Sequence, residues 1–217
     1  MAVLISRKTI FWEVDAQRDF MLPGGKLYVP GAEKIIPYIN RLVEAARQGR
    51  VFLISSADAH NPDDPEFREW PPHCLKGSSG ADLVAEACAP NRLVIPNQRG
   101  FALPENVTAY LQVTLKKNTL DVFDNPNTDA LLKRITAAGS PAFDPDPEFV
   151  VFGVATEYCV QRTADGLLRR GHRVAVVTDG VRSIDPDKGR QALANLHSSG
   201  ARLITVEDAL ALVDVLP

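Results

Sequence analysis

FVVFGVATEYC, residues 149–159, is the stretch that decides the fold. Its first half is an apolar, β-branched run of the kind that forms a strand buried on both faces. Its second half begins at Thr156, a typical N-cap residue, and so predicts a helix that starts directly after the strand. A buried strand that passes straight into a helix is typical of a parallel sheet with helical crossovers.

The same alternation of strand and helix patterns recurs on both sides of this stretch. Apolar β-rich runs predict strands at 9–14, 50–55, 110–115, 149–154, 173–178 and 202–205. Helical periodicity predicts helices at 31–48, 127–138, 157–170, 185–198 and 206–213. Right-handed crossovers between such strands place helices on both faces of the sheet. The sequence therefore predicts an α/β fold of three layers, α/β/α, around a mainly parallel sheet.

Two segments interrupt the alternation without dividing the chain. Residues 58–80 are polar and rich in proline, and a long irregular loop of this kind is usually functional. Residues 140–148, SPAFDPDPE, are expected to form a surface loop. The chain has 217 residues and shows neither an internal repeat nor a linker, so we expect one domain over residues 1–217.

Composition excludes several classes of protein. With 24 Lys+Arg against 27 Asp+Glu the net charge is −3, which argues against a partner that is a nucleic acid or an anionic membrane. No apolar run approaches the ~20 residues of a membrane span, and the N-terminus lacks the basic flank and cleavage site of a signal peptide. Three cysteines cannot form a closed set of disulfides, so a reducing cytoplasm is the expected location.

Reactive side chains follow several of the predicted strands. In open α/β sheets ligands bind beyond the carboxyl ends of the parallel strands. Asp15 follows the first strand, Asp58 and His60 follow the second, and Lys116 and Lys117 follow the third. The turn after residues 149–154 contains the cysteine discussed next. We therefore expect these groups to meet at one edge of the sheet.

Cys159 falls in the first turn of the predicted helix. There the free backbone N–H groups and the positive end of the helix dipole favour a thiolate and could hold an oxyanion. The alternative is a buried cysteine that packs as a small hydrophobe.

Asp15 and a lysine complete a candidate catalytic group. A carboxylate at the end of a buried strand is partly desolvated, which raises its pKa and suits a general base. The alternative for Asp15 is a loop residue that accepts backbone hydrogen bonds, the role expected of Asp19. An ammonium near Asp15 and Cys159 would stabilise their anionic forms, but spacing alone does not choose between Lys116 and Lys117.

The loop after the second strand carries a candidate metal site. Asp58 and His60 are two residues apart in an extended segment and so share a face. Glu66 and His73 lie downstream, and such a mixed set of nitrogen and oxygen ligands suits Zn²⁺, Fe²⁺ or Mn²⁺. The alternative is two loop histidines that bind nothing. The two remaining histidines, at 172 and 197, are expected in a turn and on a helix surface.

The motifs together resemble the isochorismatase-like cysteine hydrolase superfamily and, within it, the nicotinamidases. The resemblance spans most of the chain in the family's order. It rests on VDAQRDF (14–20), PGGKLYVPGA (23–32), SADAH (56–60), PEF (65–67), WPPHCLKGSSGADL (70–83), KNTLDVFDNPNTDALL (117–132), GVATEYCV (153–160) and GHRVAVVTDGVRS (171–183).

This resemblance implies roles for particular residues. The family's catalytic triad falls on Asp15, Lys117 and Cys159, and thus on Lys117 rather than its neighbour. A cis peptide bond is implied between Val154 and Ala155, with the N–H groups of Ala155 and Cys159 forming the oxyanion hole.

A metal site and a substrate pocket are implied as well. The metal ligands fall on Asp58, His60 and His73, with Glu66 as a further carboxylate that binds directly or through water. They would hold one divalent ion, Zn²⁺ first and Fe²⁺ or Mn²⁺ as alternatives. The implied substrate-binding residues are Phe20, Trp70, Val154 and Tyr158.

The implied reaction is hydrolysis of nicotinamide to nicotinate and ammonia through a cysteine thioester. Arg18 and Glu157 depart from the family pattern, in which Asn and Asp are usual, and Arg18 beside the pocket could alter substrate choice. Two alternatives stay open: a related hydrolase of another small amide or carbamoyl compound, and a non-catalytic metal-binding module. Isochorismatases proper lack the metal ligands, so the metal loop favours a nicotinamidase. The sequence leaves open whether the chain forms a homo-oligomer.

Overall fold

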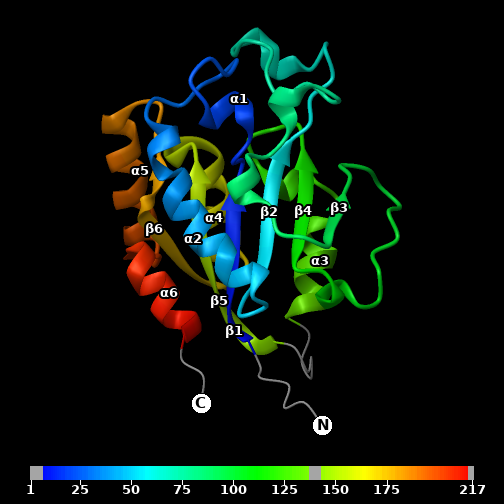
Figure 1. The fold of residues 1–217 in the computed structure, drawn as a ribbon, viewed down its shortest axis with the longest axis vertical. Coiled ribbons are helices and arrows are strands. Elements are labelled where there is room, and N and C mark those ends of the chain that lie inside the picture. Colours follow the sequence, from blue (N-terminus) through cyan, green and yellow to red (C-terminus); the bar gives the residue numbers. More distant parts are fainter. Residues whose placement is uncertain (1–6, 137–142, 215–217) are drawn as a thin grey trace.

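The computed structural model, which describes residues 7–136 and 143–214, is built around a seven-stranded sheet (Figure 1). The strand order is β3-β4-β2-β1-β5-β6-β7, and every pairing between these strands is parallel. The strands are β1 (Arg7–Val14), β2 (Phe52–Asp58), β3 (Arg92–Ile95), β4 (Gln112–Lys117), β5 (Phe143–Val154), β6 (Arg173–Arg182) and β7 (Arg202–Ile204). The α/β class and the parallel sheet predicted from the sequence are confirmed.

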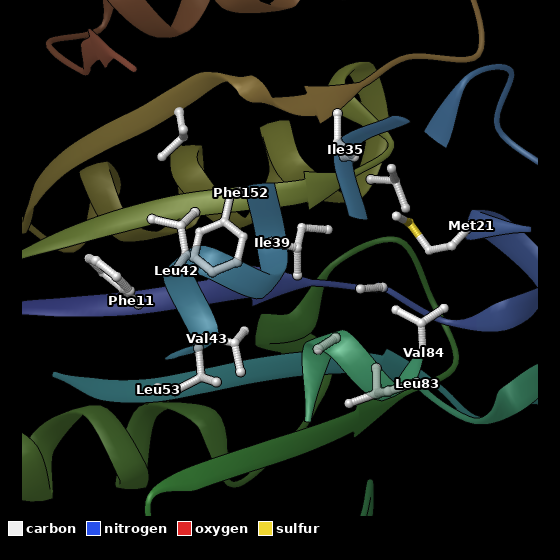
Figure 2. Close-up of a cluster of buried hydrophobic side chains, with 14 of the residues drawn as sticks. Phe11, Met21, Ile35, Ile39, Leu42, Val43, Leu53, Leu83, Val84 and Phe152 are labelled. Atoms are coloured by element: carbon white, nitrogen blue, oxygen red, sulfur yellow. The ribbon is translucent and has the colours of Figure 1, made fainter. Parts of the chain in front are cut away.

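Helices cover both faces of the sheet. They are α1 (Arg18–Met21), α2 (Ile36–Arg47), α3 (Thr128–Ile135), α4 (Gln161–Arg169), α5 (Pro186–Ser198) and α6 (Val206–Asp214). One apolar core joins α2 and α6 to one face, and a second core joins α3, α4 and α5 to the other. Figure 2 shows Leu42 and Val43 of α2 packed over Phe11 and Leu53 of the central strands. Side chains alternate along β1, which is why this strand contributes to both cores.

Two strand regions differ from the sequence prediction. β3 was not predicted, because this edge strand has only four residues and is largely exposed, so its apolar run is short. The surface loop expected at 140–148 is wrong for residues 143–148, which begin β5, while 140–142 lie outside the described residues. The pairing of β1 with β5 is irregular in this part, since its register shifts between Arg7 and Thr9.

Several predicted helices have altered ends. The segment expected as one helix at 31–48 starts with a 3₁₀ turn, Ala32–Ile35, before α2. The helix expected at 127–138 is α3, which ends at Ile135; residues 137 and 138 are outside the described part of the chain. The long loop at 58–80 contains only short 3₁₀ turns, at Pro65–Arg68 and Ser79–Ala81. Among the described residues, no helix has the length and apolar character needed to cross a membrane.

Candidate active site and metal centre

Four neighbouring strands of the sheet end at the candidate site. β1 is followed by Asp15, β2 ends at Asp58, β4 ends at Lys117, and β5 leads into the turn that carries Cys159. Asp58 and Lys117 are direct partners in the pairing of β2 with β4. The expectation that these side chains meet at one sheet edge is confirmed.

Lys117 lies at the centre of this group. Its Nζ atom is 2.8 Å from Asp15 Oδ2 and donates a hydrogen bond to Asp58 Oδ1. The same atom is 3.5 Å from Cys159 Sγ. Lys117 is fully buried, so the two carboxylates supply the negative charge that an ammonium needs in such a place. Lys116, the alternative left open by spacing, forms no hydrogen bond or ion pair with these groups in the described structure.

The charges shift the pKa values of their neighbours in different directions. Burial would lower the pKa of Lys117, but Asp15 and Asp58 raise it well above its ordinary value. Burial would raise the pKa of Asp58, but Lys117 and the two histidines of the loop hold it far below its usual range. For Asp15, burial prevails over Lys117, and the pKa is raised. Asp15 is therefore the carboxylate better able to accept a proton.

The backbone around Asp15 turns sharply at the end of β1. Asp15 has a φ of +52°, and short polar residues such as aspartate tolerate this left-handed region. Ser56 Oγ donates to Asp15 Oδ1 at 2.9 Å, and the Asp15 N–H donates to the Ser56 carbonyl at 3.2 Å. Gly153 passes so close to the Val14 carbonyl that a side chain there would collide with it. These contacts hold Asp15 beside the end of β5.

The turn that carries Cys159 differs from the predicted helix start. Ala155 rather than Thr156 is the N-cap residue, and Thr156–Val160 forms a π-helical turn before α4. The Val160 N–H donates to the Ala155 carbonyl at 3.2 Å, which closes this wider turn. The peptide bond between Val154 and Ala155 is cis, as the resemblance implies.

The helix start alone does not decide the charge of Cys159. Burial raises the pKa of the Cys159 thiol well above its ordinary value, and although Lys117 opposes this shift, Asp15 and Asp58 add to it. Burial and the two carboxylates therefore outweigh the effect of the helix start on the thiol pKa. The resting group is a neutral thiol hydrogen-bonded to Asp15. A nucleophile at this position needs a base, and Asp15 is the adjacent one.

Asp58, His60 and His73 form a tight cluster beside this group. One ligand atom from each lies within 4.8 Å of the others, and Asp58 Oδ2 is 3.7 Å from each histidine Nε2. His60 Nδ1 is 3.1 Å from Asp64 Oδ2, and His73 Nδ1 is 2.8 Å from the Pro71 carbonyl. Both Nε2 atoms are buried and have no hydrogen-bond partner in the described structure.

This arrangement fits a divalent metal ion. A metal-binding histidine commonly donates its second ring nitrogen to a carboxylate or a carbonyl, which orients the first toward the ion. Two buried and unpartnered nitrogens facing a carboxylate would otherwise be costly. Glu66 Oε1 is 3.8 Å from His73 Nε2, but Glu66 is not part of the tight cluster of three. Asp64 was not predicted, although its place four residues after His60 in a loop is a usable signal.

A cavity opens between the cysteine and the metal cluster. All four predicted substrate-binding residues line it, namely Phe20, Trp70, Val154 and Tyr158. Trp70 and Tyr158 meet edge to face with ring centroids 5.3 Å apart, whereas Phe20 packs on the His73 ring at 5.2 Å. The prediction missed four aliphatic lining residues that come from three loops, namely Leu27, Val29, Leu120 and Ile184.

Other residues singled out in the sequence lie outside the cavity. Arg18 has an exposed side chain and is not among the lining residues. Glu157 Oε1 accepts from the Asp185 N–H at 2.8 Å and so ties the π-helical turn to the start of α5. His172 packs on Phe149, and His197 lies near the Ala201 carbonyl, both away from the site.

Gln17 and Asp19 form hydrogen bonds to the backbone of the segments that carry the site. The Gln17 side chain accepts from the Asp58 N–H at 2.6 Å and donates to the Asp58 and Ala81 carbonyls at 2.8 Å. Asp19 accepts from the Cys74 N–H at 2.7 Å, which confirms its predicted backbone-bonding role. Gln17 was not predicted, because nothing in its local sequence indicates a contact 41 residues away.

Comparisons with known proteins match nearly the whole described chain. The family described as "Isochorismatase domain" matches residues 10–103 and 89–208. The nicotinamidase of Escherichia coli is 27% identical over 217 residues, covering 90% of this chain and 93% of the relative.

Two solved structures share the fold. A Pyrococcus horikoshii pyrazinamidase in complex with zinc superposes with a TM-score of 0.70 at 27% identity, covering 91% of this chain and 99% of that one. An N-carbamoylsarcosine amidase from Thermoplasma acidophilum superposes with a TM-score of 0.68 at 25% identity, covering 92% and 97%. The similarity therefore includes every segment that builds the site.

Proposed function

The chain belongs to the isochorismatase domain family, and on this basis we propose that it is a metal-containing cysteine amidohydrolase that converts nicotinamide and water to nicotinate and ammonia. One observation carries the proposal: a buried lysine joins Asp15 and Cys159 beside a cluster of metal-ligand type. Nicotinamidase relatives that align over about nine-tenths of the chain support the substrate.

The first half-reaction forms a thioester. Asp15 accepts the proton of the Cys159 thiol, and the thiolate sulfur attacks the amide carbonyl. The N–H groups of Ala155 and Cys159 hold the oxyanion of the tetrahedral intermediate. Protonated Asp15 then gives its proton to the departing nitrogen, the C–N bond breaks, and ammonia leaves.

The second half-reaction regenerates the enzyme. Asp15 accepts a proton from water, which attacks the thioester carbonyl. The C–S bond breaks, the sulfur recovers a proton from Asp15, and nicotinate is released. Lys117 holds Asp15 in place through its 2.8 Å contact and stabilises the negative charge that moves between Asp15 and sulfur.

We assign Asp58, His60 and His73 as the ligands of one divalent ion, Zn²⁺ first, because two imidazoles and a carboxylate are a common catalytic zinc set. A zinc-containing pyrazinamidase of the same fold supports this choice. When bound, the ion would accept the ring nitrogen of the substrate and so fix the direction of the amide. Glu66 would bind the ion through water. Phe20 and Trp70 would form the walls of the cavity on either side of the substrate ring.

Ammonia release from nicotinamide tests the proposal directly. Cys159→Ala should lower the rate by at least ~10³-fold, because it removes the covalent nucleophile. Cys88→Ala, which alters a half-buried thiol outside the cavity, is the matched control and should keep activity within about twofold. Activity of Cys159→Ala within tenfold of the unmodified protein would refute the assignment.

A second substrate class has one observation in its favour. The N-carbamoylsarcosine amidase shares the fold at 25% identity, so a carbamoyl compound is the alternative substrate. A panel of nicotinamide, pyrazinamide and N-carbamoyl amino acids distinguishes the two. Hydrolysis of the carbamoyl compounds alone would replace nicotinamide, and no hydrolysis of any would favour a non-catalytic module.

We further propose that residues 1–217 act as one catalytic domain in the cytoplasm. The three cysteines are unpaired, which suits a reducing compartment. Size-exclusion chromatography with light scattering would determine whether the chain forms a homo-oligomer.

A further inference from the structure

A second cavity lies on the face of the sheet that α2 covers, at the edge formed by β3 and β4. Consecutive residues of a strand point to opposite faces, so Lys116 points away from the side occupied by Lys117. Lys116, Thr114 and Arg92 line this cavity together with part of the loop at 81–83. Its volume is about 180 Å³, which is small for an organic cofactor and sufficient for a small ion with its waters.

Thr114 brings an unused hydrogen-bonding group to the cavity. It is 1% exposed, and its hydroxyl has no partner among the residues that the structure describes. Gln112, two residues earlier on the same face, donates to Ser55 Oγ and the Ala87 carbonyl and accepts from the Ala89 N–H. The Gln112 side chain just beyond the cavity is thus fully paired, whereas the Thr114 hydroxyl, which lines the cavity, is not.

Two cations flank Thr114. In the pairing of β3 with β4, Val94 lies opposite Thr114, and Arg92 is two residues before Val94 while Lys116 is two residues after Thr114. The two cationic residues are therefore about 13 Å apart along the strands, a span that their long side chains can close over Thr114.

Neither cation is neutralised by an ion pair within the described parts of the chain. Arg92 donates to Cys88 Sγ at 3.3 Å, and no salt bridge forms at Arg92 or Lys116. Burial lowers the pKa of Lys116, and the positive charge of Arg92 lowers it further. Asp82 is the acidic residue that lines the cavity, so the two cations leave one net positive charge.

We propose that this cavity binds a small oxyanion, the carboxylate or phosphate group of a small metabolite, held by Arg92 and Lys116 with a hydrogen bond donated by Thr114. A guanidinium presents paired N–H donors that match the oxygens of such a group. The anion would relieve the repulsion between the cations and satisfy the Thr114 hydroxyl. The cavity selects against cations because two of its walls are positive.

The site is separate from the catalytic cavity but shares a loop with it. The Asp82 carbonyl accepts from the Arg18 N–H at 2.9 Å, and the Val84 N–H donates to the Ala16 carbonyl at 2.9 Å. This loop thus supports the segment that follows Asp15. Anion binding is expected to stabilise the folded protein, and its test needs no assumption about the reaction.

Isothermal titration of the full-length, metal-replete protein tests the site. Inorganic phosphate and acetate are the two probes, titrated separately at an ionic strength fixed with sodium chloride. The unmodified protein should bind at least one of them saturably. Arg92→Gln and Lys116→Met should each weaken binding at least fivefold, and Thr114→Val about threefold. Arg92→Lys, which keeps the charge, should bind better than Arg92→Gln.

Two variants serve as matched controls. Arg99→Gln removes an exposed cation outside the cavity, and Thr163→Val removes a buried, unpartnered hydroxyl on the other side of the sheet. Both should bind as the unmodified protein does. A preference for acetate or for phosphate identifies the group. The proposal is overturned if neither probe binds saturably, or if the double variant Arg92→Gln/Lys116→Met binds as tightly as the unmodified protein.

Discussion

The two faces of the sheet differ in how their charged side chains are paired. On one face Lys117 lies between Asp15 and Asp58, and its pKa is raised. On the other face Lys116 has no ion pair in the described structure, and its pKa is lowered. Glu13, which shares that second face, is fully buried, and burial raises its pKa to about 8.

The contrast shows that position alone does not determine what a buried charged group does. The two lysines are consecutive, yet one is held as a cation by two carboxylates and the other is left without a strong partner. A charged cluster that is both desolvated and paired can move protons between its members, because small changes in geometry shift the balance. A desolvated cation without a partner is instead poised to bind an anion.

The largest expected effect contrasts the two lysines directly. Lys117→Met should lower kcat/KM for nicotinamide by ~10³-fold or more, because it leaves two buried carboxylates without their cation. The loss caused by Lys116→Met should be at least ~100-fold smaller. Steady-state kinetics on both variants decide the matter, with circular dichroism to establish that each is folded. Equal losses would mean that the triad register is wrong.

Measurement of bound metal tests the cluster that contains Asp58. His60→Ala and His73→Ala should each lose bound metal, whereas His172→Ala, away from the site, should keep it. Asp64→Asn should weaken metal affinity by about 10–100-fold, because Asp64 orients His60. Metal analysis of the purified proteins, beside competition with a chelator, gives these values. A full metal complement in the His60→Ala/His73→Ala double variant would exclude the site.

Glu66→Gln should be the mildest of the changes around the metal cluster. Its carboxylate lies 3.8 Å from His73 Nε2 and outside the tight set of three, so water can take its place. Retention of metal with a modest change in KM is the expected result. Loss of the metal would instead make Glu66 a direct ligand.

These contrasts also mark what the sequence could predict. Periodicity located the central strands, because continuous apolar runs such as 149–154 have few other interpretations. It could not choose between two consecutive lysines, since that choice depends on the pairing of β4 with β2, which places Lys117 opposite Asp58. The resemblance to a family supplied the choice that periodicity could not.

Features that depend on distant contacts or on summed electrostatics were missed or misjudged. Leu27, Leu120 and Ile184 meet in the cavity only because the fold brings their loops together. The neutral state of Cys159 follows from the sum of burial and two carboxylates, which outweighs the local effect of a helix start. The strand at 143–148 was hidden by its prolines, which usually mark loops.

The pH dependence of stability tests the raised pKa of Glu13, which lies on the same face of the sheet as Lys116. The pKa of Glu13 is about 8 in the folded protein, against an ordinary value of 4.5 in the unfolded chain, so the fold favours the neutral acid. The resulting stability is fully present below about pH 4.5 and is lost as the pH rises through 8. The free energy of unfolding should therefore fall between pH 5 and 8.5 by roughly 3 kcal/mol relative to Glu13→Gln. Parallel pH profiles for the two proteins in urea titrations would contradict the assignment.

The smallest expected effect compares a buried hydroxyl from each side of the sheet. Thr114 and Thr163 are both buried, and neither hydroxyl has a partner in the described structure. Because an unpartnered buried hydroxyl costs free energy, Thr114→Val and Thr163→Val should each raise the free energy of unfolding by up to ~1 kcal/mol when no anion is added. Only Thr114 lines the second cavity, so phosphate or acetate, whichever binds, should raise the Tm of Thr163→Val as it does for the unmodified protein, and raise that of Thr114→Val less. Thermal denaturation with and without the anion, at constant ionic strength, measures both effects. An equal gain in Tm for the two variants would remove Thr114 from the anion site, because it would show that the stabilisation is independent of this hydroxyl.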